Sequence, residues 1–163
     1  MLIEMKVSSL LCDPFTEAPI VVLVDASGKH SVPLWVGPNE AAAIAAELEQ
    51  VRLDRPTTHD LLKSVVSICG AQVKHVEIHD LQKGTYFATI HLLREGNTAA
   101  TLDSRPSDAI ALAMRTGARI YVTKKVLDKV RRQADRSDLP QVVYEAGDKP
   151  NGFVVRPTFK WKI

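Results

Sequence analysis

The sequence PNEAAAIA at residues 38–45 returns, in a modified form, as PSDAIALA at residues 106–113. Each copy reads proline, a small polar residue, an acidic residue and then an alanine-rich apolar run. Proline is tolerated in the first turn of a helix, and asparagine and serine are good helix caps, so both copies predict helix starts. Glu40 and Asp108 then occupy equivalent places, each in the first turn of its helix.

Two β-type runs joined by a glycine-containing turn precede each copy. The first pair spans residues 20–24 and 31–36, and the second spans residues 85–93 and 98–102. A hairpin leading into a helix therefore occurs twice. This pattern predicts an α/β fold in an α+β arrangement, built as one compact domain from a duplicated β-hairpin–helix unit with a mixed sheet. A pseudo-twofold axis between the halves would make Glu40 and Asp108 equivalent in space.

Capping residues mark the remaining helices. Asn39 is expected to cap a helix running toward Leu53, and Thr58 to cap one that stops at Gly70. Thr123 is expected to cap a basic helix that ends near residue 134. Beyond it, the sequence DRSDLP has the composition of a linker. We therefore expect one domain over residues 1–134 and a C-terminal β-type extension over residues 135–163.

Composition limits the class of protein. The chain has 163 residues, of which 45% are hydrophobic and 25% charged, and a formal net charge of +2. No apolar run approaches the roughly 20 residues of a membrane span, and the N-terminus lacks the pattern of a signal peptide, so we expect a cytoplasmic protein and no membrane partner. Cys12 and Cys69 lie outside any zinc-type spacing and are expected to be small core residues. The charge is too small by itself to require a nucleic-acid partner.

Charged side chains gather at the predicted helix starts. They are Glu40, Arg55, His59, Asp60, Asp103, Arg105 and Asp108. Carboxylates suit divalent cations, arginines grip phosphate, and histidine moves protons near neutral pH, so the set is suited to metal-assisted phosphodiester hydrolysis. The same residues also fit a purely structural network, because acidic side chains stabilise helix N-termini and Arg–Asp pairs hold loops to them. Residue types and spacing leave both interpretations open.

Two further groups have simpler explanations. His75, Glu77 and His79 alternate on a predicted strand, where residues four apart are separated by roughly 13 Å, so the two histidines cannot share one ion. We expect a solvated sheet face there, and His91, in a strand, has no obvious partner. The basic helix at residues 124–134 and the aromatic–cationic run at residues 155–162 could follow phosphates or stack bases, but a solvated helix and a strand explain them as well.

Four motifs occur in order along the chain. They are EAAAIA at residues 40–45, RPTTHDLL at residues 55–62, GTYFA at residues 84–88 and DSRPSDAIALA at residues 103–113. This set closely resembles the bifunctional nuclease domain family. The resemblance covers about residues 1–134.

The resemblance implies a compact α/β domain that self-associates and degrades both DNA and RNA. The chain's copies of the motif residues are Glu40, Arg55, His59, Asp60, Asp103, Arg105, Ser107 and Asp108. We expect a hydrolase with weak sequence preference, in which a divalent cation (Mg²⁺ or Mn²⁺) is held by Asp60, Asp103, Asp108 and Glu40.

In that hypothesis His59 acts as general base or acid, and Arg55, Arg105 and Ser107 bind the phosphate. The expected partners are nucleic acid, DNA or RNA, and further copies of the chain in a homo-oligomer. The alternative is a non-catalytic, self-associating binding or regulatory module whose charged motifs are structural.

Overall fold

The computed structural model describes residues 1–134 as a mixed seven-stranded sheet with four α-helices. The strands are β1 (Leu2–Cys12), β2 (Pro19–Asp25), β3 (Ser31–Trp35), β4 (Ala71–Gln82), β5 (Thr85–Arg94), β6 (Thr98–Ser104) and β7 (Arg119–Thr123). The helices are α1 (Pro38–Leu48), α2 (Thr58–Ile68), α3 (Pro106–Thr116) and α4 (Lys124–Ala134), and a short 3₁₀ turn (Glu95–Asn97) joins β5 to β6. The predicted α/β class is confirmed. The extension predicted for residues 135–163 lies outside the described residues.

The duplicated unit is larger than a hairpin. The strand order is β3-β2-β1-β7-β4-β5-β6, so each half is a three-stranded antiparallel meander. β7 lies between the halves and pairs antiparallel with β1 and parallel with β4. Hence β1 and β4 run in opposite directions, as a twofold relation between the meanders requires.

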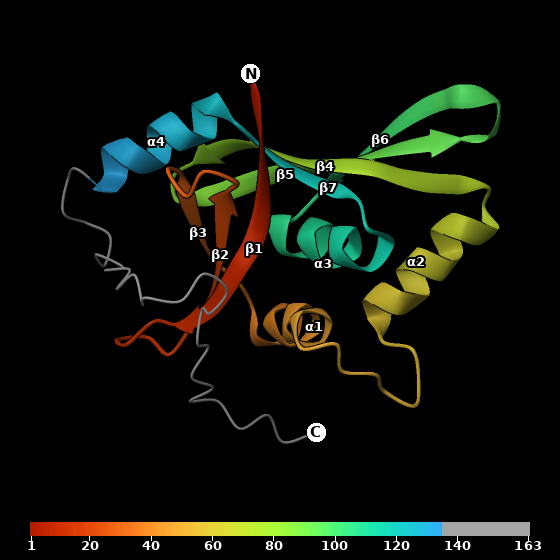
Figure 1. Cartoon of the computed structure of the whole chain (residues 1–163), viewed down its shortest axis with the longest axis horizontal. Coiled ribbons are helices and arrows are strands. Elements are labelled where there is room, and N and C mark those ends of the chain that lie inside the picture. The colour runs from red at the N-terminus through yellow and green to blue at the C-terminus, as the bar shows by residue number, and fades with distance from the viewer. Residues whose placement is uncertain (135–163) are drawn as a thin grey trace.

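Helices α1, α2 and α3 lie together on one side of the sheet in two layers (Figure 1). α3 packs directly on β4 and β5, and α1 and α2 pack against α3 (Figure 1). The alanine-rich sequence explains this arrangement, because Ala109, Ala111 and Ala113 are fully buried and their small side chains allow neighbouring elements to approach closely. On the sheet, Val76, Ile78 and Ile90 face this core.

The helix ends agree with the sequence in part. Gly70 and Gly117, with φ of 68° and 69°, end α2 and α3 as predicted. The predicted N-caps were wrong by one or two residues: Gly37 rather than Asn39 precedes α1, and Thr57 rather than Thr58 precedes α2. Pro38 explains the first shift, because its fixed φ suits the first helical position.

α1 also ends earlier than predicted. Its last residue is Leu48 rather than Leu53, and the chain leaves it through Gln50 in a left-handed conformation with φ of 55°. The two cysteines were likewise misassigned, because Cys12 and Cys69 are exposed free thiols rather than core residues. Within residues 1–134, no helix is long and apolar enough to cross a membrane.

Candidate functional site

The first turns of three helices meet at one charged cluster. Glu40 is the third residue of α1, His59 the second of α2 and Asp108 the third of α3. Arg105, just before α3, donates from Nε to Asp108 Oδ2 (2.6 Å) and from Nη2 to Glu40 Oε1 (2.7 Å). His59 Nε2 lies 3.1 Å from Asp108 Oδ1. We call these four side chains the Arg105 cluster.

Within the Arg105 cluster only Arg105 is exposed, and His59 is buried, with its side chain 10% exposed. The Arg105 side chain is 66% exposed, whereas the Glu40 and Asp108 side chains are 16% and 26% exposed. Partial burial pushes the pKa of Asp108 upward, but the hydrogen bonds from Arg105 and His59 outweigh it and hold that pKa below its usual value. The hydrogen bonds to Asp108 and then to Glu40 raise the pKa of the Arg105 guanidinium. The exposed Arg105 guanidinium is therefore held by two less exposed carboxylates, those of Asp108 and Glu40.

Asp60 belongs to a different network. Its Oδ2 accepts hydrogen bonds from the Thr57 amide (2.8 Å) and hydroxyl (2.7 Å), which is the Thr57-x-x-Asp60 pattern of a capping box. Its Oδ1 accepts from Arg115 Nε at 2.8 Å. Burial raises the pKa of Asp60, but these hydrogen bonds outweigh it and lower the pKa to about 2.

Arg115 joins three helices. Its side chain is only 3% exposed, and besides Asp60 on α2 its Nη1 donates to the carbonyl of Ala43 on α1 (3.1 Å) and of Ala111 on α3 (3.0 Å). No motif in the sequence pointed to Arg115 as a site residue. Its position near the end of a predicted amphipathic helix, among apolar residues, was the available signal.

Within residues 1–134, the other predicted site residues form no side-chain hydrogen bond or ion pair with the Arg105 cluster. Arg55 and Asp103 are exposed, and within residues 1–134 neither forms a side-chain hydrogen bond or ion pair. Ser107, in the first turn of α3, is buried. Asp103 on β6 pairs in register with Thr89 on β5, which pairs with Glu77 on β4. Side chains directly opposite share one face, so Asp103 lies on the face of the sheet that carries Glu77.

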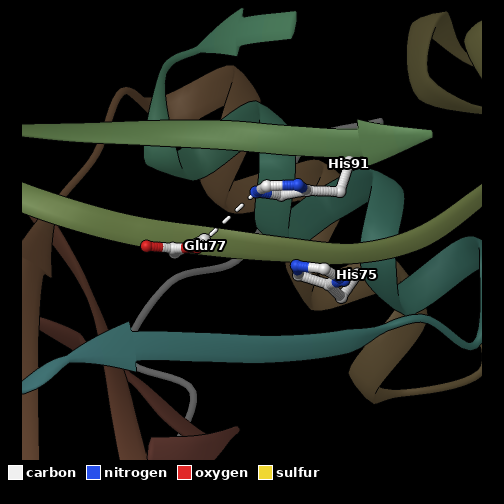
Figure 2. Close-up of side chains that lie close together, drawn as sticks. All are labelled: His75, Glu77 and His91. Atoms are coloured by element: carbon white, nitrogen blue, oxygen red, sulfur yellow. Dashed lines mark ion pairs between the residues drawn. The ribbon is translucent and has the colours of Figure 1, made fainter. Parts of the chain in front are cut away.

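That face holds a second group of titratable side chains. His75 and Glu77 lie on β4, and His91 lies opposite His75 on β5 (Figure 2). Each contributes a potential ligand atom, and these atoms all lie within 4.8 Å of one another. The two imidazole rings stack with centroids 4.1 Å apart, and His91 Nε2 lies 3.6 Å from Glu77 Oε2. Burial, and then the proximity of His91, lower the pKa of His75.

This His/Glu group revises the sequence interpretation. His79 is not part of it, in agreement with the distance argument, but His91 has two partners that the sequence did not reveal. Within the described residues it is the one group of three or more His, Cys, Asp or Glu side chains with ligand atoms that close together. The four carboxylates predicted to hold a cation do not meet in this way. Glu40 and Asp108 share Arg105, and Asp60 is bound to Arg115.

Two lysines of the basic helix α4 form ion pairs within the domain. Lys125 and Lys129 each place Nζ 2.8 Å from a carboxylate oxygen of Asp80 on β4. The hydrogen bonds from these lysines lower the pKa of Asp80. Because both ammonium groups already have an anionic partner, they are less suited to tracking a phosphate backbone than the sequence alone indicated.

The fold and site define a mixed α/β domain with an exposed arginine held by carboxylates where three helices begin. The family model of the bifunctional nuclease domain matches residues 21–135, and the chain belongs to this family.

Named relatives add detail to this assignment. An uncharacterized protein of Mycobacterium tuberculosis (strain H37Rv) is 39% identical over 124 residues, which are 76% of this chain and 73% of that protein. "Bifunctional nuclease 2" of Arabidopsis thaliana is 29% identical over 143 residues, 80% of this chain and 42% of that protein. "Bifunctional nuclease 1" of Oryza sativa subsp. indica is 28% identical over 109 residues, 66% of this chain and 33% of that protein. The chain therefore spans less than half of these two plant proteins.

Proposed function

We propose that this chain is a nuclease that hydrolyses phosphodiester bonds of DNA and RNA with weak sequence preference. The observation that carries the proposal is the Arg105 cluster, an exposed guanidinium over the first turns of three helices, in a chain of the bifunctional nuclease domain family. Helix N-termini carry partial positive charge and unpaired N–H groups, and both favour a phosphate. A pair of named nucleases among the plant relatives supports the same reaction class.

Arg105 is suited to bind the scissile phosphate. Its Nε and Nη2 are bound to Asp108 and Glu40, while within residues 1–134 no hydrogen bond is recorded for Nη1. The carboxylates thus fix the plane of the guanidinium and leave one edge directed to water. Arg55, exposed on the loop before α2, is the candidate for a second phosphate-binding cation.

His59 is suited to move the proton. Its Nε2 lies 3.1 Å from Asp108 Oδ1, and a carboxylate at that distance stabilises the imidazolium that forms when the histidine accepts a proton from an attacking water. The same imidazolium then returns the proton to the leaving oxygen. Asp108 has two partners in this arrangement: it accepts two hydrogen bonds from Arg105 and lies against His59, so it orients both.

Metal dependence is a separate part of the proposal. Mg²⁺ or Mn²⁺ prefers carboxylate oxygens, and Glu40 and Asp108 are the nearest pair. Both already accept hydrogen bonds from Arg105, so a cation bound between them would compete with that guanidinium. We therefore expect any cation at the Arg105 cluster to bind together with the phosphate, which would draw Arg105 away from one carboxylate.

The second candidate function is a non-catalytic, self-associating binding or regulatory module, and an apolar stripe on α2 favours it. Leu61, Val65 and Ile68 follow the i, i+4, i+7 spacing of one helix face and are 60%, 47% and 85% exposed. A homo-oligomer formed through this stripe would cover it. Self-association is also compatible with the nuclease, so the two candidates differ only in whether the Arg105 cluster does chemistry.

We also propose a cytoplasmic location for the chain. Cys12 and Cys69 are exposed free thiols, and such thiols persist in a reducing compartment.

A nuclease time course on fluorescent single-stranded DNA and RNA tests the proposal. Wild type is compared with His59→Gln and Asp108→Asn, with and without EDTA. The control is Asp128→Asn, which makes the same charge change at an exposed position of α4. Loss of cleavage in the two cluster variants, with full cleavage by the control, supports catalysis at this site. Equal cleavage by all samples indicates a contaminant, and no cleavage by folded wild type favours the binding module.

A further inference from the structure

We propose that His75, Glu77 and His91 bind a divalent transition-metal ion of the Zn²⁺ class on the face of the sheet away from α3. This inference does not rest on the proposed nuclease activity. It concerns a different face of the domain from the Arg105 cluster and stands on the placement of three side chains.

The strand pairing fixes the three ligands. His75 and His91 are directly opposite in the β4–β5 register, so their side chains share a face. Glu77 is two residues further along β4 and therefore points to the same side (Figure 2). The main-chain hydrogen bonds between the neighbouring strands β4 and β5 thus hold the three groups together before any ion binds, which reduces the entropy lost on binding.

The distances are close to those of a coordination shell. Around Zn²⁺, ligand atoms at about 2.1 Å in tetrahedral geometry lie about 3.4 Å from one another. Here His91 Nε2 and Glu77 Oε2 are 3.6 Å apart, and all three ligand atoms lie within 4.8 Å. Rotation about side-chain torsions closes the remaining gap. The rings, now stacked with an interplanar angle of 17°, would have to tilt so that their lone pairs converge.

One buried nitrogen of the group forms no hydrogen bond within residues 1–134. His91 Nε2 is buried and forms no hydrogen bond with any described residue, because the 3.6 Å separation from Glu77 exceeds hydrogen-bond distance. Buried polar side-chain atoms are nearly always satisfied, and an exception calls for an explanation such as an ion. A metal bound through this nitrogen provides one.

The donor atoms indicate the class of ion. Two imidazole nitrogens and one carboxylate suit Zn²⁺ and neighbouring transition metals, whereas Mg²⁺ and Ca²⁺ prefer oxygen ligands only. Three protein ligands also leave a fourth position for water, as in zinc sites that remain open. The Tyr121 ring packs edge-on against the His75 ring, with the ring centroids 5.5 Å apart, and would help to hold His75 in place as a ligand.

The test is metal binding by the full chain, produced without a polyhistidine tag and freed of metal with EDTA. Titration with ZnCl₂ in a calorimeter should show one saturable site per chain, and MgCl₂ should show none. His75→Ala and His91→Ala should each weaken Zn²⁺ binding by at least about 100-fold, because loss of a mere supporting residue already costs 10–100-fold. Glu77→Gln keeps the side-chain shape and should weaken it less. His79→Ala, on the same strand but outside the group, is the matched control and should bind as wild type does.

A second readout is independent of affinity. Co²⁺ at this site should give visible absorption of the intensity typical of four-coordinate cobalt, and His91→Ala should lose it while keeping the wild-type circular dichroism spectrum. The proposal is overturned if Zn²⁺ binding is absent, or if it is equal in wild type, His75→Ala and His91→Ala. Neither result bears on the nuclease proposal, which depends on cleavage assays at the other site.

Discussion

Replacing Arg115 by methionine should destabilise the domain by about 3 kcal/mol. The buried guanidinium makes three hydrogen bonds, to the Asp60 carboxylate and to the carbonyls of Ala43 and Ala111. A hydrogen bond contributes about 1 kcal/mol net, and methionine keeps the apolar packing while removing all three. The loss stays below the full cost of breaking a buried ion pair, because the Asp60 side chain is 37% exposed and water can solvate it.

Urea unfolding at neutral pH measures this loss, and a thermal melt should show a decrease of roughly 6–12 °C in Tm for a chain of this size. Arg119→Met is the control, because the Arg119 side chain is 69% exposed and lies 3.8 Å from Glu4. That variant should stay within about 0.5 kcal/mol of wild type. In an Asp60→Asn background the cost of Arg115→Met should fall by about 1 kcal/mol. A loss below about 1 kcal/mol, or one no greater than in Arg119→Met, would refute the view that Arg115 joins the three helices.

Three other substitutions probe separate features. The folded pKa of Asp60 is about 2, below its unfolded value, so its contribution to stability is present above about pH 4 and is lost as the pH falls toward 2. Because the Asp60 side chain is 37% exposed, we expect this contribution to be about 1 kcal/mol. Between about pH 4 and pH 2 the urea midpoint of Asp60→Asn should therefore fall less than that of wild type. Tyr86→Phe removes the hydrogen bond from the Tyr86 hydroxyl to the Pro33 carbonyl (3.0 Å) and should lower the free energy of unfolding, measured by chemical denaturation, by about 1 kcal/mol. An unchanged free energy of unfolding would count against that contact. Gly117→Ala puts a side chain at φ of 69°, where the added Cβ meets open space, so the cost is backbone strain of about 1 kcal/mol. This strain should lower the Tm by a few degrees, and a rise in Tm would show that it is absent.

Much of the fold was accessible from local patterns. The two Pro-cap-acid starts and the glycines at 70 and 117 specified where helices begin and end within one or two residues. The sequence equivalence of Glu40 and Asp108 also pointed to two residues that lie close together in the structure, since both carboxylates accept hydrogen bonds from Arg105. These features follow from capping and backbone conformation, which depend on a few adjacent residues.

The His/Glu group depended on information that the sequence does not carry locally. Counting outward from the Gln82–Thr85 pair would place His75 opposite Leu92, on the other face from His91. An irregularity in β4 between Ile78 and Asp80 shifts the register by one residue and brings His91 opposite His75. A β-bulge has no reliable sequence signal, so the partner of His91 could not be found by spacing.

The site residues divide in a similar way. Arg105 and Asp108 are three residues apart on one helix start, so their contact was predictable from spacing. Asp60 and Asp103 were grouped with them by charge and motif, but Asp60 accepts its hydrogen bonds from Thr57 and Arg115, and Asp103 lies on β6. Which carboxylates meet is decided by tertiary packing, and in this domain the deciding partner, Arg115, lies 55 residues from Asp60 in sequence.

The position of β7 has a consequence for synthesis. Its residues, Arg119–Thr123, are made after both meanders, yet they form the strand that lies between β1 and β4. Until they leave the ribosome, β1 and β4 each present an unpaired edge, and such edges can pair with the wrong strand or with another chain. The pairing of Leu2 with Thr123 spans nearly the whole described sequence, and contacts this distant form slowly. Within residues 1–134, the nascent chain is therefore most vulnerable to aggregation just before β7 emerges, when both edges are complete and the strand that separates them is still missing.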